Sequence, residues 1–168
     1  SRGQLAPSGH GGRERKNPHG QDDEAHARLR LRPFLFDSTV LLDIVTADAK
    51  WMEWSSEQFR RAAKAAPVLI NPIIYAEIAP AFDSQAALDH WLRPQHFRRL
   101  PLPYEAGFRA SRAFLEYRQR GGQKSSPLPD FYIGAHAETA GFTLVTRDQT
   151  RYKTYFPDLK ILAPPATR

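Results

Sequence analysis

The sequence predicts an α/β fold, with a short, mostly parallel sheet of four to five strands and helices on both of its faces. Three observations lead to this prediction. Apolar runs of three to five residues alternate with stretches of helical periodicity, and no two-residue hairpin turn joins one run to the next. The first run ends directly in a carboxylate, as Phe34-Leu-Phe-Asp37. Short apolar runs are typical of buried parallel strands, which crossover helices connect.

The composition indicates one folded domain, residues 33–168, behind an N-terminal extension. Residues 1–32 have almost no periodic apolar positions, so we expect disorder, as in a tag remnant, a translated upstream sequence or a basic arm. The formal charge of +6 is shared evenly between the two parts and points only weakly to a polyanionic partner. The chain has no cysteine, which excludes disulfides and thiolate zinc sites. No apolar run reaches membrane-spanning length, and we expect a cytoplasmic protein.

The first half of the domain is predicted to contain two strands and four helices. The predicted strands are 34–36 and 68–70, and the predicted helices are 40–45, 50–66, 73–82 and 84–92. Ser38 or Thr39 can cap the first of these helices with its hydroxyl. Asn71-Pro72 opens the third helix, with Pro in its favoured first turn.

The second half is predicted to alternate strands and helices in the same way. The predicted strands are 98–102, 142–146 and 160–162, and the predicted helices are 104–120 and 130–140. Gly121-Gly122 ends the long helix, and a rigid Pro-containing loop, 125–129, leads into the next one. Gly134 is expected to let that helix approach the sheet closely.

Four acids fall at comparable places in this pattern. Asp37 ends the first strand, Asp148 follows the fourth, Glu77 lies in the helix after the second, and Asp130 opens the helix 130–140. The carboxyl ends of parallel strands meet at one edge of a sheet. We therefore expect Asp37 and Asp148 to lie together there.

Metal-dependent hydrolysis is the chemistry expected of this acidic group. Several carboxylates within a few ångströms of one another cannot all stay ionised without a cation, and oxygen-only ligands favour Mg²⁺ or Mn²⁺. Such ions polarise a phosphoryl oxygen and lower the pKa of a bound water. Residues two apart in extended chain face the same way, so Thr39 would line the pocket with Asp37, and Thr146 with Asp148.

In their order along the chain these motifs resemble the PIN-domain ribonucleases, specifically the VapC-type toxins of toxin–antitoxin pairs. The resemblance covers about residues 33–162. The motifs that carry it are Phe36-Asp-Ser-Thr-Val-Leu-Leu-Asp43, Ile70-Asn-Pro-Ile-Ile-Tyr-Ala-Glu77, Ser126-Pro-Leu-Pro-Asp-Phe-Tyr-Ile-Gly-Ala-His-Ala137 and Leu144-Val-Thr-Arg-Asp148, with the following Arg151-Tyr152 and Tyr155-Phe156-Pro157. One departure is Thr39, where family members often have Asn.

The resemblance implies a PIN-like three-layer fold and a role for individual residues. The residues implied to be catalytic are Asp37, Glu77, Asp130 and Asp148. Those implied to bind Mg²⁺ or Mn²⁺ are Asp37, Asp130 and Asp148, supported by Thr146 and Ser38. For Arg147 and Arg151, which flank the site, contact with RNA phosphates and a solvated surface role both remain open.

The resemblance also implies partners: an RNA substrate, a small antitoxin protein and a second copy of the chain, with helix 104–120 as a candidate homodimer interface. The helix around Trp51, Trp54 and Phe59 and the helix 73–82 fit either the core or a groove for the antitoxin. Two other functions are weighed. A non-catalytic RNA- or protein-binding module of the same fold would not need all four acids. An aspartyl phosphatase-like hydrolase using Asp37 as nucleophile would need a second acid where Thr39 stands.

Overall fold

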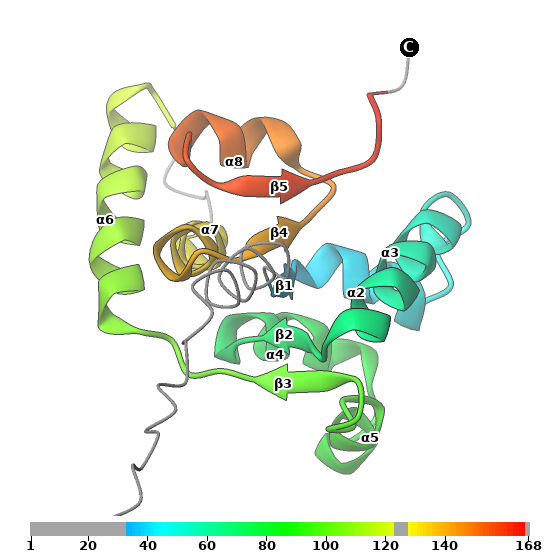
Figure 1. Cartoon of the computed structure of the whole chain (residues 1–168). Coiled ribbons are helices and arrows are strands. Elements are labelled where there is room, and N and C mark those ends of the chain that lie inside the picture. The colour runs from blue at the N-terminus through cyan, green and yellow to red at the C-terminus, as the bar shows by residue number, and fades with distance from the viewer. Residues whose placement is uncertain (1–32, 123–127, 167–168) are drawn as a thin grey trace, which may run out of the picture. The chain divides into compact units, whose positions relative to one another are not determined.

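The computed structural model describes residues 33–122 and 128–166 (Figure 1). The expected disordered extension, 1–32, and most of the predicted loop 125–129 lie outside the described residues. Within the two described segments, no helix combines the length and apolar character needed to cross a membrane.

A single five-stranded parallel sheet forms the centre of the domain, as the sequence predicted. Its strands are β1 (Phe34–Phe36), β2 (Val68–Ile70), β3 (Phe97–Arg99), β4 (Thr143–Val145) and β5 (Lys160–Leu162), in the order β3-β2-β1-β4-β5. The register pairs Leu35 of β1 with Leu69 of β2 on one side and with Leu144 of β4 on the other. The three leucines are buried, so the middle of the sheet is apolar across its three central strands.

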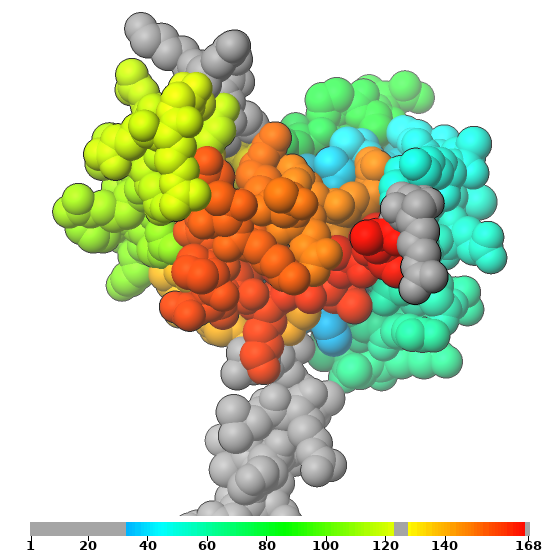
Figure 2. Space-filling model, turned by 90° about the horizontal axis from the view of Figure 1, so that it is seen from above, coloured from blue at the N-terminus to red at the C-terminus, as the bar shows by residue number. Residues whose placement is uncertain are grey.

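Helices cover both faces of this sheet. They are α2 (Ser38–Val45), α3 (Met52–Ala65), α4 (Pro72–Ile78) with the 3₁₀ turn η1 (Ala79–Ala81), α5 (Gln85–Trp91), α6 (Tyr104–Gln119), α7 (Leu128–Ala140) and α8 (Gln149–Tyr155). The chain reverses its direction across the sheet after β3, and the right-handed crossovers usual between parallel strands place the helices after such a reversal on the opposite face. Figure 2 shows the surface of α8 (orange) between those of α6 (yellow-green) and α3 (cyan).

Gly134 allows a close approach of α7 to α8, the two helices that begin at predicted acids. A Cβ atom added to Gly134 would lie 2.6 Å from Cε2 of Phe156 and 2.9 Å from Cδ1 of Tyr152. Both aromatic side chains are almost fully buried. The contact is therefore with the end of α8 rather than with the sheet itself.

The elements differ from prediction mainly at their ends. The predicted helix 73–82 is too long, because Pro80 cannot continue an α-helix and the chain turns into η1 after Ile78. The third strand is Phe97–Arg99 rather than 98–102, since Pro101 and Pro103 lack the N–H that a strand needs. Helix α7 begins at Leu128, with Pro129 in its first turn, where proline is tolerated.

Candidate active site

The predicted acids lie around the point where the strand order of the sheet reverses. From β1 the chain moves outward through β2 to β3, and it then returns to the other side of β1 for β4 and β5. Asp37 follows β1 directly, and Thr146 follows β4. Open α/β sheets bind their ligands in the crevice outside such a reversal.

Asp37 is a buried carboxylate held by hydroxyl groups. Its side chain is only 4 % exposed. The Thr146 hydroxyl donates to Oδ2 over 2.7 Å, and the Ser38 and Tyr152 hydroxyls lie 3.4 Å from Oδ1 and Oδ2. Burial raises the pKa of Asp37 to about 6; the Thr146 hydrogen bond lowers it and the charge of Asp130 raises it further. Asp37 thus takes up a proton more readily than an ordinary aspartate.

Glu77 reaches the same region from α4. Burial, followed by the charges of Asp130 and Asp37, raises the pKa of Glu77 to about 7. Its Oε1 atom is buried and has no hydrogen-bond partner. An unpaired buried carboxylate oxygen is costly, and a cation is the partner that would offset the cost.

Asn71 and His136 join the helices that carry Glu77 and Asp130. The side-chain oxygen of Asn71 caps α4 by accepting from the Ile74 N–H over 3.0 Å. Its Nδ2 lies 3.1 Å from Nδ1 of His136 in α7. Both side chains are buried, and burial lowers the pKa of His136. A neutral imidazole accepting from Asn71 is therefore a connection between α4 and α7.

Asp130 and Asp148 share one guanidinium. Asp130 lies in the first turn of α7, and Asp148 caps α8 by accepting from the Arg151 N–H over 3.3 Å. The Arg151 side chain forms an ion pair with Asp130 through Nη1 and places Nε 3.3 Å from Oδ2 of Asp148. Burial raises the pKa of Asp130, while Arg151 lowers it. Arg151 is thus the resident positive charge of the acidic group.

Tyr152 belongs to a motif that the sequence analysis noted, but that analysis gave it no role in the site. Burial, followed by the charges of all four acids, raises the pKa of its phenol well above the ordinary value. The phenol therefore lies near enough to Asp37, Glu77, Asp130 and Asp148 for each of these charges to raise its pKa. The sequence feature that could have indicated its role is its position four residues after Asp148, which places both residues on the same side of a helix.

Thr39 and Ser38 do not occupy the places predicted for them. Helix α2 begins at Ser38, so the chain after Asp37 is not extended, and Thr39 is exposed. The expectation that Thr39 lines a pocket with Asp37 was wrong for this reason. The expectation that Ser38 or Thr39 caps α2 was also wrong, because Asp37 is the N-cap residue and makes no side-chain cap bond.

The donor set of the four acids fits a hard divalent cation. It consists of carboxylate oxygens with hydroxyls beside them, which suit Mg²⁺ or Mn²⁺. Burial raises the pKa values of Asp37 and Glu77 most, and the charges of neighbouring carboxylates raise them further, an effect that a bound cation would oppose. As placed, no three acidic or histidine side chains of segments 33–122 and 128–166 surround a common point. Asp130 and Asp148 are instead paired with Arg151.

Arg147 lies against α2 and α3. Its Nε is 3.0 Å from Oδ2 of Asp43, and its guanidinium carbon is 5.2 Å from the centre of the Trp51 ring. The Asp43 side chain is only 3 % exposed and also accepts from the Ser55 hydroxyl over 2.8 Å. Contact between Arg147 and RNA remains a prediction, and it would compete with this ion pair.

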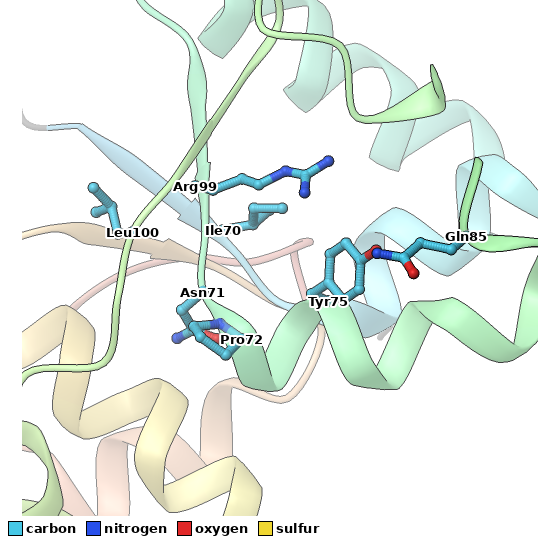
Figure 3. Close-up of a pocket in the computed structure, with 7 residues that line it drawn as sticks. All are labelled: Ile70, Asn71, Pro72, Tyr75, Gln85, Arg99 and Leu100. Carbon is cyan, nitrogen blue, oxygen red and sulfur yellow. The ribbon is translucent and has the colours of Figure 1, made fainter. Parts of the chain in front are cut away.

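A separate cavity opens beside β2 and β3 (Figure 3). It has a volume of about 280 Å³ and is lined by Ile70, Asn71, Pro72, Tyr75, Gln85, Arg99 and Leu100. The Arg99 guanidinium lies 5.2 Å from the Tyr75 ring centre and pairs with Asp89 over 2.8 Å, so its charge is already balanced. None of the four acids lines this cavity, and we place the candidate site at the carboxylates, where charge is unbalanced.

Comparison with known proteins agrees with this architecture. A sequence model of the PIN domain matches residues 34–157. Among solved structures, DNA-bound VapBC from Salmonella typhimurium is 18% identical with a TM-score of 0.60, and the match covers 79% of this chain and 98% of that one. VapBC2 from Rickettsia felis bound to a promoter DNA fragment is also 18% identical (TM-score 0.59; 78% and 98% covered).

A toxin–antitoxin complex from Klebsiella pneumoniae is 20% identical, with a TM-score of 0.52 and with 79% of this chain and 98% of that one covered. A search of curated protein sequences found no match. At these identities the solved structures establish the fold, while the sequence match spans most of the chain. The chain belongs to the PIN domain family.

Proposed function

We propose that this protein is a VapC-type toxin that hydrolyses RNA phosphodiester bonds with Mg²⁺ or Mn²⁺. The observation that carries the proposal is the acidic group at the strand reversal. It contains two carboxyls whose pKa values rise to about 6 and about 7, and one of them has a buried, unpaired oxygen. A divalent cation bound by such carboxylates would polarise a phosphoryl oxygen and lower the pKa of a bound water, which is the chemistry of a metal-dependent nuclease. The PIN family match and the toxin–antitoxin structures with the same fold support this choice.

In the proposed reaction the residues of the chain have separate tasks. Asp37, Asp130 and Asp148 would hold the cation, and the chemistry it would supply is polarisation of the phosphoryl group and a lower pKa of the attacking water. The Thr146 hydroxyl keeps Oδ2 of Asp37 in one orientation. Glu77, with a pKa of about 7, accepts a proton on Oε1 near neutral pH.

Arg151 has a second task in this proposal. In the structure it neutralises Asp130 and Asp148, which are the carboxylates assigned to the cation. A bound divalent ion would take over that role, because it carries twice the charge. The released guanidinium could then contact an RNA phosphate, for which its planar donors are suited.

An RNA cleavage assay with a matched pair of variants tests the proposal. We expect cleavage with Mg²⁺ or Mn²⁺, none with EDTA, and a loss of at least about a hundredfold in Asp130→Asn, because a metal ligand is removed. Asp158→Asn is the control, because Asp158 is an exposed acid away from the proposed ligands. Full cleavage in EDTA, or equal activity of the two variants, would contradict the proposal.

A small antitoxin is the expected restraint on such an enzyme in the cytoplasm. The solved structures with this fold include toxin–antitoxin complexes. A partner could neutralise the acids by placing an Arg or Lys among them, as Arg151 does within the chain. Of the aromatic residues considered for its groove, Trp54 and Phe59 pack against the core. Co-purification with the product of a neighbouring small reading frame, and inhibition of cleavage by it, would test this part.

The proposed homodimer has a candidate surface on α6. Tyr104, Phe108 and Leu115 are 97%, 66% and 49% exposed, and their spacing places them on one side of the helix. Apolar side chains grouped in this way mark interaction surfaces. Phe108→Asp should convert a dimer to a monomer in light scattering, whereas Asp158→Asn should not.

A further inference from the structure

The segment 146–148, which carries Asp148, belongs to neither β4 nor α8. On one side it is held by Thr146, which is fully buried. The Thr146 hydroxyl donates to Asp37 over 2.7 Å and accepts from the Asp148 N–H over 3.1 Å. This side chain therefore links the Asp37 carboxylate to the backbone of Asp148.

On the other side the segment is held by Arg147. Its Nε lies 3.0 Å from the nearly inaccessible Asp43 carboxylate, and its guanidinium lies over the Trp51 ring. The Nε–H group does not point at the oxygen closely enough for a hydrogen bond, so the contact is ionic. The Ser55 hydroxyl fixes the same Asp43 oxygen from α3 over 2.8 Å.

Asp43 gives this ion pair a fixed relation to the acidic group. Asp43 lies in α2, about one and two-thirds helical turns after Asp37, the N-cap residue of that helix. A guanidinium bound to Asp43 therefore ties the segment 146–148 to the same helix that begins at Asp37. By contrast, the Asp148 side chain is 46% exposed, and its one ion pair, with Arg151, is 3.3 Å long.

We propose that Arg147 is a positioning residue which, with Asp43 and Trp51, sets the place of the Asp148 carboxylate relative to Asp37. The inference rests on the proposed function, because it assigns Arg147 to the geometry of the metal site. It also gives Arg147 a role other than contact with RNA. Residues that orient metal ligands from behind typically change metal affinity by about ten- to a hundredfold when they are replaced.

The sign of the effect separates positioning from simple charge. Removing a positive charge next to a group of carboxylates strengthens cation binding if charge alone acts. Loss of the Arg147 contact weakens cation binding if it displaces Asp148. In the double variant Asp43→Asn/Arg147→Gln the net charge is unchanged, so weaker binding there cannot arise from net charge.

The test is a titration of the RNA-free protein with Mn²⁺, in which free Mn²⁺ is measured by electron paramagnetic resonance. We expect Arg147→Gln and the double variant to bind about tenfold more weakly than the wild type. The loss of affinity should be similar in the two variants, because both remove the same contact between Asp43 and Arg147. Arg147→Lys keeps the charge, and its Mn²⁺ affinity should lie between those of the wild type and Arg147→Gln. Arg93→Gln, a change at an exposed arginine, is the matched control and should bind as the wild type does.

Equal or tighter Mn²⁺ binding by both Arg147→Gln and the double variant would overturn the positioning role while leaving the metal site in place. If Arg147→Gln fails to fold with Asp43 unpaired, the double variant decides. A loss of RNA binding in EDTA with unchanged Mn²⁺ affinity would make Arg147 an RNA contact instead. If the wild type binds no Mn²⁺ at all, the proposed function fails together with the inference.

Discussion

Replacing the carboxylate of Asp37 by an amide should stabilise the protein at neutral pH. The pKa of about 6 in the fold, against an ordinary value of 3.8, means that the folded state holds the proton more tightly than the unfolded chain does. At about 1.36 kcal/mol per pH unit, this difference corresponds to about 3 kcal/mol. The cost grows as the pH rises from about 4 and is complete above about 6.

Asp37→Asn removes this cost but retains an oxygen that can accept from Thr146. The net pKa shift already contains the difference between a charged and a neutral acceptor for Thr146, so the expected gain in unfolding free energy at pH 7.5 is about 3 kcal/mol. At pH 4 the gain should vanish, because the wild-type carboxyl is then protonated in the fold.

Urea unfolding in EDTA at the two pH values measures this difference, and Asp158→Asn controls for the loss of a surface charge. A destabilised Asp37→Asn at pH 7.5 would refute the reasoning. So would a gain of the same size at pH 4, because it could not come from the ionisation of Asp37.

Three further predictions concern the same region. The apparent affinity for Mn²⁺ should fall as the pH is lowered from 8 to 5. Glu77 and Asp37, with pKa values of about 7 and about 6, then take up protons that compete with the cation. An affinity that calorimetry finds independent of pH would count against this. Arg151→Gln should bind Mn²⁺ about three- to tenfold more tightly in the same assay, since the cation no longer displaces a guanidinium, and weaker binding would show that Arg151 assists it. Gly134→Ala should destabilise the fold by about 1–2 kcal/mol, because its Cβ would lie 2.6 Å from Phe156. In Gly107→Ala the nearest contact of the new Cβ is at 3.5 Å, so stability should be unchanged or higher. Thermal unfolding of both variants measures the difference.

The sheet and the order of its elements were predictable because each depends on local pattern. The run Phe34–Phe36 is apolar and ends in Asp37, and such a run is stable only as a buried strand. The same pattern located the acids, since parallel strands bring their carboxyl ends to one edge. Helix ends were less predictable: the chain after Asp37 enters α2 at once, which turned Thr39 outward.

Contacts between distant segments could not be predicted from spacing. Arg147 and Arg151 are both basic residues near Asp148, yet one pairs with Asp43 and the other with Asp130. Their partners are set by how α2, α7 and α8 pack, which no local rule specifies. Tyr152 belongs to the same class, because its contact with Asp37 spans 115 positions.

In the proposed mechanism Asp37, Asp130 and Asp148 bind one divalent cation, with Glu77 beside it. Anomalous scattering from crystals soaked in Mn²⁺ tests this most directly. We predict a Mn²⁺ peak in contact with the oxygens of those three aspartates, with the Arg151 guanidinium moved away from Asp130. A Mn²⁺ peak elsewhere on the protein, or Arg151 still paired with both aspartates in crystals of an enzyme that cleaves RNA with Mn²⁺, would contradict it.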